Sequence, residues 1–508
     1  MTEAAVNGGP RLAFQAFWLL VARTIAFTMT LVLPIVLTRL FTDDQFGTYR
    51  LALVACTTAS NILSFNVGVS AFYYLPRLSD VGRRQLIFNI TAYHVVLGAL
   101  VVASTLLWPD MLTALPGTAA LAPLTRVVGL MIAFVVFAGF FETIATANQD
   151  VWYSTAFIVT AQLTRALMIV AAAFYYRTVS AVLWAWIIQA ICQSAFLLWY
   201  LHHRFPYFWR YRSGPIAAEQ ARYVWPLGIT TVLTVLQLDI HNYIVSYSFS
   251  TATYAVYAIG TSQVPLIGIL RDSIQAVMQS RMSQLQQNDD KAAMLHLLLR
   301  TWRILAAACI PAFVGLMLLA DDFITALYTA SYKGSIPIFR LNLALIIVTM
   351  FVTDAVVRAF ADQRVWVLRN RATILMTQLA LSAILIRYMG LMGVLAALVT
   401  SWAIERILNI RLVFRTLGFG RQHRYIFWEL GHVTILAVAA GAITFALLAA
   451  FPAATSALRL LVGVAVYGFA YVLLILTTGF LNPDEKELLA AWGTRWQRIV
   501  KIRFSAGT

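Results

Sequence analysis

Long apolar runs separated by short polar connections fill the chain from residue 13 to residue 481. Because each run is about 20 residues long, a helix formed by it can cross the roughly 30 Å core of a bilayer. The runs are continuous rather than alternating, which excludes a transmembrane β-barrel. We therefore predict an all-α polytopic membrane protein with about fourteen transmembrane helices. The predicted spans are Ala13–Leu40, Gly47–Leu75, Leu86–Trp108, Val127–Ala147, Trp152–Tyr175, Ala181–Leu201, Tyr223–Tyr247, Thr253–Val277, Ile304–Ala320, Ile336–Phe360, Val365–Tyr388, Met392–Phe414, Leu430–Phe451 and Leu460–Leu481.

A stretch near the start of the chain recurs in its middle. Leu33–Leu53 contains the elbow between the first two spans, and Leu238–Ala258 matches it about 205 residues later, with Tyr49 aligned to Tyr254. Both copies lie at the first elbow of a similar set of helices, so the repeat predicts two six-helix lobes of like topology plus two C-terminal helices. The predicted division is 1–12 cytoplasmic N-terminus, 13–203 N-terminal lobe, 204–222 cytoplasmic linker, 223–415 C-terminal lobe, 416–481 helices thirteen and fourteen, and 482–508 cytoplasmic amphipathic tail.

The distribution of charge is more informative than its sum. The net charge of +16 suggests nucleic acid as a partner. However, a content of 61% hydrophobic residues and a mean hydropathy of +0.78 are typical of a membrane protein. Of the 37 lysines and arginines, 27 fall in one set of alternating connections and 8 in the other. The positive-inside rule then places both termini in the cytoplasm, and we predict membrane lipids rather than nucleic acid as the surroundings of these basic residues.

Sequence motifs for covalent or metal chemistry are absent. The sequence has no phosphate-cradling Gly-rich loop with its lysine, no nucleophile elbow and no metal-ligand spacing, and its three cysteines lie far apart. We therefore predict a protein that is not an enzyme and carries no cofactor, with H⁺, Na⁺ or the membrane potential as the driving force of any transport.

Arg23 is the clearest candidate for a functional charge, because it lies in the middle of the first span, where an ionisable group is expensive. At helical spacing it shares a stripe with Thr30 and Pro34 that is more polar than the rest of the helix. Either this stripe lines a wet cavity, or Arg23 pairs with a carboxylate of a neighbouring helix purely for packing. Arg50, near the outer end of the second span, either rings the mouth of that cavity or pairs with the adjacent Asp43–Asp44 elbow.

Further charges lie inside other spans. Arg165 is in the middle of the fifth span and Glu142 is near the inner end of the fourth, so they either pair with each other or line the path. Asp239, in the seventh span, is a candidate for coupling or for structural pairing. Asp354 and Arg358 are four residues apart near the inner end of the tenth span, a spacing that favours an interfacial ion pair over a coupling role.

Two short motifs and their counterpart in the second half carry a family resemblance. They are Phe46-Gly47-x-Tyr49, Leu75-Pro76-Arg77 at the end of the second span, and Asp239 followed by Thr253-x-x-x-Tyr257-Ala258. Together they resemble the polysaccharide flippases of the Wzx type, within the multidrug/oligosaccharidyl-lipid/polysaccharide exporter superfamily. The second copy departs from the family pattern, because no glycine precedes its tyrosine.

The resemblance implies a flippase that moves a polyprenyl-diphosphate-linked oligosaccharide, such as an O-antigen, capsule or exopolysaccharide repeat unit, from the inner to the outer leaflet of a bacterial inner membrane. Alternating access of two lobes would carry it, with glycan polymerase and glycosyltransferases as partners. A diphosphate favours guanidinium groups that grip two oxygens at once. On this interpretation Arg23, Arg165, Arg50 and Thr30 lie on the substrate path, with Asp239, Glu142, Asp354 and Arg358 as coupling or cavity charges.

Other functions make different demands on the sequence. A cation-coupled multidrug or metabolite antiporter of the same superfamily predicts fewer cavity arginines, more carboxylates and commonly twelve helices. A membrane-embedded polysaccharide polymerase or ligase predicts a sizeable outer loop with arginine and histidine, whereas the longest outer connection here is around Pro109–Arg126. A purely structural subunit leaves Arg23 unexplained.

Overall fold

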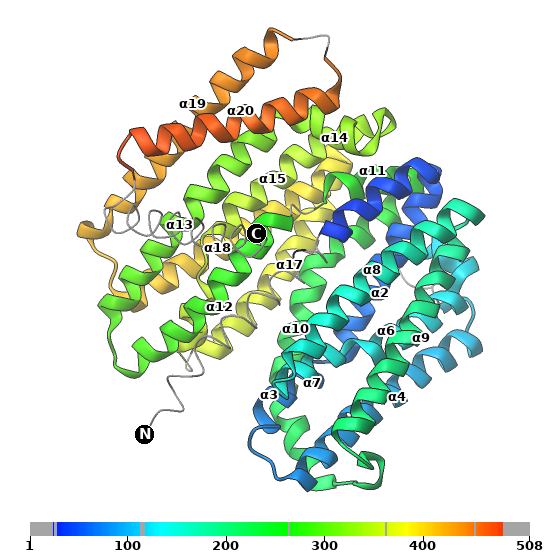
Figure 1. Cartoon of the computed structure of the whole chain (residues 1–508). Helices are drawn as coiled ribbons and strands as arrows, with labels where there is room; N and C mark the ends of the chain where they lie inside the picture. The colour runs from blue at the N-terminus through cyan, green and yellow to red at the C-terminus, as the bar shows by residue number, and fades with distance from the viewer. Residues whose placement is uncertain are drawn as a thin grey trace, which may run out of the picture.

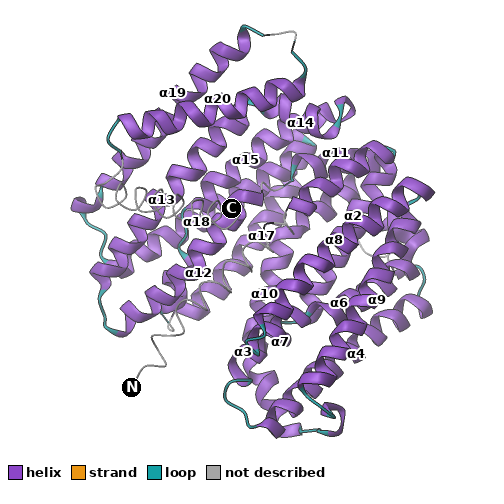
Figure 2. Cartoon of the chain, viewed as in Figure 1, coloured by secondary structure: helices purple, strands orange, loops and turns teal. Residues whose placement is uncertain are grey.

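The computed structural model describes residues 24, 28–111, 117–262, 265–360, 363–451 and 454–480, and all regular structure among them is helical (Figure 2). An apolar helix, Thr28–Leu40, comes first. The others are α2 (Asp43–Ser64), η1 (Gly68–Ser70), α3 (Ala71–Tyr74), α4 (Asp80–Leu107), η2 (Ala119–Leu124), α6 (Thr125–Gly139), α7 (Phe141–Ala147), α8 (Val151–Tyr176), α9 (Val179–Arg204), η3 (Phe208–Arg210), α10 (Gly214–Ser248), α11 (Thr251–Gly260), α12 (Pro265–Gln287), α13 (Lys291–Leu318), α14 (Ala320–Tyr328), η4 (Ala330–Ser335), α15 (Ile336–Met350), α16 (Asp354–Ala359), α17 (Arg364–Met389), α18 (Leu391–Leu417), η6 (Arg421–His423), α19 (Tyr425–Ala449) and α20 (Ser456–Thr477).

The helices confirm a polytopic all-α membrane protein. Within the described residues, 11 helical segments are long and apolar enough to cross a bilayer, or 12 if α2 and η1–α3, bent by 47°, form one span. The predicted count of about fourteen is not confirmed, because the first predicted span is described continuously only from Thr28 and the eighth is divided into α11 and α12. Arg271, Asp272 and several glutamines lie within α12, so this helix is not apolar enough to count as a span by itself.

The first elbow and its counterpart have the same local structure. Thr42 caps α2 by accepting a hydrogen bond from the Gln45 backbone N–H, and Ser250 caps α11 by accepting one from the Thr253 N–H. In both cases the preceding helix ends two residues before the cap. Thr42 therefore corresponds to Ser250, a spacing of 208 residues. The predicted spacing of about 205 was wrong by three residues, since ungapped sequence matching does not register helix caps.

Two groups of helices pack around the contact between α2 and α11. In the first half α2, α6 and α9 pack together, with α4 on α6 and α8 on α9. In the second half α13, α15 and α18 pack together, with α12 on α13 and α17 on α18; α19 then covers α13, and α20 covers α19 and α14 (Figure 1). The halves meet where α2 packs against α10 and α11.

The contact between α2 and α11 explains the glycine in the Phe46-Gly47 motif. A Cβ atom at Gly47 would lie 2.2 Å from the backbone oxygen of Thr251, so only glycine allows the two helix starts to approach this closely. Beside this crossing, the buried ring of Phe46 packs edge-on against Tyr332 of the second half, with centroids 6.1 Å apart. The contact between α2 and α11 is therefore a buried, aromatic joint between the halves.

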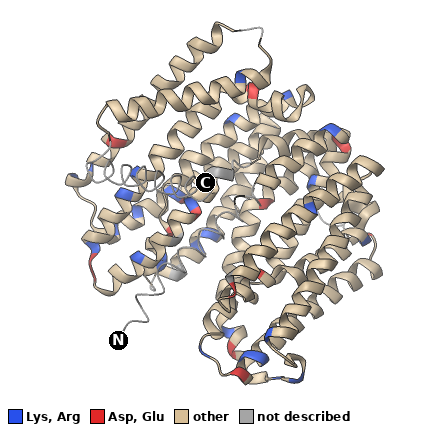
Figure 3. Ribbon diagram, in the orientation of Figure 1, with Lys and Arg blue, Asp and Glu red and all other residues tan. Residues whose placement is uncertain are grey.

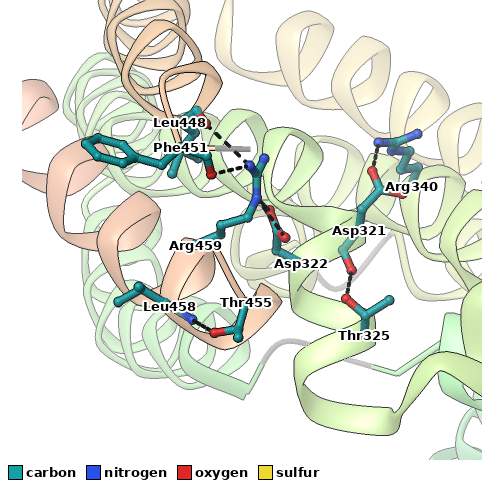
Figure 4. A network of polar contacts seen from close by, with 9 residues as sticks. All are labelled: Asp321, Asp322, Thr325, Arg340, Leu448, Phe451, Thr455, Leu458 and Arg459. Carbon is teal, nitrogen blue, oxygen red and sulfur yellow. Dashed lines mark hydrogen bonds and ion pairs between the residues drawn. The ribbon is translucent and has the colours of Figure 1, made fainter. Parts of the chain in front are cut away.

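A half-buried ion pair joins the last two helices to the second half (Figure 4). The Arg459 Nε of α20 donates to both carboxylate oxygens of Asp322 in α14, each at 3.3 Å. Its Nη1 donates to the backbone oxygens of Leu448 and Phe451 at the end of α19, also at 3.3 Å. One guanidinium thus ties together α14, α19 and α20.

We predict that Asp322→Asn destabilises the protein by about 2 kcal/mol, because it leaves the half-buried Arg459 charge without its carboxylate. The neighbouring pair gives a matched control. Asp321 accepts from Arg340 at 2.6 Å, but these side chains are 60% and 43% exposed, so Asp321→Asn is expected to cost less than about 1 kcal/mol. Thermal unfolding in detergent measures both. Equal losses for the two variants would contradict the proposed role of the buried pair.

Candidate functional site

The first half contains a cavity of about 60 Å³ between the helix Thr28–Leu40, α2, α8 and α9. Its polar and aromatic lining consists of Thr30, Tyr49, Arg50, Gln162, Arg165 and Trp186. Three residues predicted for the substrate path, Thr30, Arg50 and Arg165, are thus brought together. Arg23 lies outside the described residues, and Thr30 and Pro34 from its predicted stripe both line the cavity.

Arg165 is oriented by neutral partners. Its Nη2 donates to the Gln162 Oε1 one turn earlier on α8, and its guanidinium carbon lies 5.2 Å from the ring centroid of Trp186 on α9. Within the described chain Arg165 forms no ion pair with a carboxylate. Of the two alternatives for Arg165 and Glu142, pairing with each other is not seen among the described ion pairs. Glu142 lies in the first turn of α7 and has other interactions.

Arg50 contributes a second guanidinium to the same cavity. It is half-buried, and its buried Nε has no hydrogen-bond partner among the described residues. It also forms no ion pair with Asp43 or Asp44, so its place at the cavity is the interpretation that the structure supports. A buried donor without an acceptor is costly, and it favours an acceptor supplied by a ligand or water.

Asp239 lies away from this cavity, at the joint between the halves. The Thr58 hydroxyl of α2 donates to its Oδ2 at 2.6 Å, across to α10. No described lysine or arginine lies within ion-pair distance of this carboxylate. Structural pairing of Asp239 with a cation is therefore not what holds it in place.

Asp354 and Arg358 do not form the predicted ion pair. Arg358 is exposed, whereas Asp354, at the start of the short helix α16, interacts electrostatically with Arg406 of α18. Arg406 also donates to the Thr353 hydroxyl at 2.8 Å. The prediction considered only the four-residue spacing within one helix, whereas α16 packs so that Asp354 faces the guanidinium of Arg406 and Arg358 faces outward.

A second cavity, of about 170 Å³, lies within the second half, between α10, α11, α12, α15 and α18. Its polar and aromatic lining consists of His241, Thr261, Ser262, Arg271, Asn342, Thr349 and Trp402. The sequence prediction missed this cavity, because most of these side chains are neutral. The 208-residue repeat in the sequence could have located this cavity, because it relates Leu33 and Leu53 of the first cavity to His241 and Thr261 of the second.

Comparisons with known proteins agree with this architecture. A family described as polysaccharide biosynthesis protein matches residues 36–337. No curated protein sequence matches the chain significantly.

Several solved structures share the fold at low sequence identity. The lipid II flippase MurJ in an inward closed conformation is 13% identical, with 92% of this chain and 99% of that chain covered and a TM-score of 0.66. An inward-facing multidrug resistance MATE family transporter of the MOP superfamily is 14% identical, with 78% and 98% covered and a TM-score of 0.60. A MOP superfamily transporter from Pyrococcus furiosus is 14% identical, with 79% and 94% covered and a TM-score of 0.56.

The likeness to these structures confirms the predicted fold, and the family match confirms the resemblance seen in the sequence motifs. The protein is a multi-pass membrane protein that shares its fold with these MurJ and MATE structures. Because more than half of the chain matches, the chain belongs to the polysaccharide biosynthesis protein family.

Proposed function

We propose that this protein is a flippase that moves a polyprenyl-diphosphate-linked oligosaccharide from the inner to the outer leaflet by alternating access. The observation that carries the proposal is the cavity in which Arg50 and Arg165 lie together without a carboxylate partner among the described residues. Two guanidiniums in a site of low dielectric constant match the paired negative charges of a diphosphate. The family membership and the similarity to a structure described as a lipid II flippase support the same cargo class.

The inner ends of the helices carry most of the basic side chains. Figure 3 shows blue ribbon segments gathered near α3 and α4 and again near α12 and α13. This distribution supports the orientation that the positive-inside rule predicts. We propose that the protein lies in a bacterial inner membrane with both termini in the cytoplasm. We also propose that glycosyltransferases make its cargo and that a glycan polymerase consumes it.

The outer ends of the two halves are joined by specific contacts. Arg39, at the end of the first helix, donates to the backbone oxygens of Leu327 at 2.7 Å and Ala326 at 3.1 Å. These oxygens belong to the last turn of α14, where a cation is favoured by the helix dipole. Alternating access by two lobes, divided as the sequence predicts, requires this contact to open when the cargo leaves outward.

A cation-coupled multidrug antiporter is the alternative function, and the structural similarity to a MATE transporter is the reason to consider it. An antiporter for cationic drugs needs carboxylates in its cavity, because an arginine repels such a cargo. Neither cavity has an aspartate or glutamate among its described lining residues. The lining therefore favours an anionic cargo.

We predict that Arg165→Gln slows translocation of a lipid-linked oligosaccharide by about 10- to 100-fold, the effect of losing charge-assisted hydrogen bonds. Arg165→Lys should recover only part of the rate, since an ammonium cannot grip two oxygens in one plane. The measurement is leaflet-resolved appearance of a labelled lipid-linked oligosaccharide in proteoliposomes.

The control for this variant is Arg177→Gln, which removes an exposed arginine from the outer end of the same helix. Its rate should equal that of the wild type. Equal rates for Arg165→Gln and the wild type would remove Arg165 from the path. Wild-type protein that exports drugs and moves no lipid-linked oligosaccharide would overturn the flippase proposal in favour of the antiporter.

We further propose that Asp239 couples translocation to an H⁺ or Na⁺ gradient, because a carboxylate that no described lysine or arginine pairs takes up a proton or cation readily within a bilayer. Asp239→Asn keeps an oxygen that can accept from Thr58 but loses the charge. We predict that it abolishes an acceleration of about fivefold or more by an imposed gradient. Thr58→Val, which removes the hydrogen bond and keeps the carboxylate, should remain gradient-dependent. An unchanged gradient response in Asp239→Asn would rule out this role.

A further inference from the structure

The second-half cavity is rich in acceptors, because its hydroxyl groups have already committed their protons. The Thr349 hydroxyl donates to the Leu345 backbone oxygen at 2.7 Å, and the Thr261 hydroxyl donates to the Tyr257 oxygen at 2.9 Å. Each hydroxyl therefore presents only lone pairs to the cavity. The oxygens of a phosphate anion only accept hydrogen bonds, so a phosphate forms no hydrogen bonds with these hydroxyl groups.

Donors are present in the same cavity. The Trp402 Nε1 is buried and has no hydrogen-bond partner among the described residues. The Arg271 Nε donates to the adjacent Asp272 carboxylate at 3.2 Å, which offsets part of its charge. Asn342 uses its amide nitrogen on the Ser262 backbone oxygen at 3.3 Å, so its own oxygen remains an acceptor. The cavity thus mixes acceptors and donors around a tryptophan.

The first-half cavity has a different chemistry. Arg50 and Arg165 are donors with full charge, and the Gln162 oxygen is already used by Arg165. That lining suits an anion, whereas the second lining suits a neutral ligand whose groups both donate and accept. Hydroxyl groups on a ring meet this description.

The size of the second cavity is consistent with one such ring. Its volume is about 170 Å³. A protein cavity of roughly 150 Å³ is large enough to admit benzene, a six-membered ring. The first cavity, at about 60 Å³, is too small for a sugar ring and suited to a compact group.

We propose that the second-half cavity is a sugar subsite, in which a pyranose of the cargo binds beside Trp402 and Thr349 while its diphosphate binds Arg50 and Arg165 in the first half. This inference rests on the proposed flippase function and adds the orientation of the cargo. Trp402 donates to a ring hydroxyl, and Thr349 and Asn342 accept from others.

Gly268 allows a sharp test. It lines the cavity, and a Cβ atom added there would meet no heavy atom within 4 Å. The Cβ of Gly268→Leu therefore meets no neighbouring atom, and the rest of the leucine side chain should take up space in the cavity while the substitution improves the helix propensity of α12. Gly431→Leu, in α19, is a matched control, because a Cβ there also meets nothing within 4 Å. Thr349→Val removes an acceptor at nearly constant volume, and Thr444→Val, buried in α19, is its control.

The experiment compares two kinds of probe in proteoliposomes. One is polyprenyl diphosphate without sugar, and the other is the same lipid bearing a single glucose, galactose or N-acetylglucosamine, the fastest of the three being used. We expect Gly268→Leu to slow the sugar-bearing probe by about tenfold or more and Thr349→Val by about fivefold. Neither should change the rate of the sugar-free probe. Arg165→Gln should slow both probes.

The outcomes separate this inference from the proposed function. If wild-type protein moves neither probe, the flippase proposal and the subsite fall together. If it moves both, and Gly268→Leu and Thr349→Val slow them equally or not at all, the sugar subsite is wrong and the flippase proposal stands. Slowing of the sugar-bearing probe by the two α19 controls as well would also overturn the subsite.

Discussion

A positive charge within a bilayer protein is tolerated only where something stabilises it, and no carboxylate of the described residues pairs with Arg165. The amide oxygen of Gln162 and the face of Trp186 hold its guanidinium, and Arg50 lies at the same cavity. Neutral partners offset only part of the cost of burial. They also leave the charge available, whereas an ion pair would cancel it. On the proposed function, this arrangement supplies the preorganisation that anion binding requires.

The joint between the halves fixes where this cavity can lie. Gly47 permits the starts of α2 and α11 to touch, and the buried Phe46 and Tyr332 rings exclude water beside that crossing. Tyr49 and Arg50 follow the glycine by two and three residues in α2, and both line the first cavity. The Phe46-Gly47-x-Tyr49 motif thus has a structural cause: Gly47 sets the separation of α2 and α11, and the residues that follow it line the cavity.

Much of this arrangement is predictable from sequence, because hydropathy and charge placement are local properties of the chain. The spans, the orientation signal and the grouping of Thr30, Arg50 and Arg165 all follow from helical spacing and from the cost of buried charge. Partnerships are not predictable in this way. The structure forms neither Arg165–Glu142 nor Asp354–Arg358 as an ion pair, because each side chain meets a partner from another helix or another turn, such as Gln162 for Arg165 and Arg406 for Asp354. The lining of the second cavity is mostly neutral, so it gave little charge signal.

Equivalent positions in the two halves have diverged in a consistent direction. At the 208-residue spacing, Arg50 corresponds to Ala258 and Leu33 to His241, so at these positions the second half loses a guanidinium and gains a hydrogen-bonding ring, while its own cavity arginine, Arg271, pairs with Asp272. A cargo with a single kind of chemistry would not favour such a difference between related cavities. A cargo that is anionic at one end and polyhydroxylated at the other does, because each half then binds the end that its own lining can satisfy. The asymmetry of the cavities, more than either cavity alone, therefore argues for a sugar joined to a diphosphate.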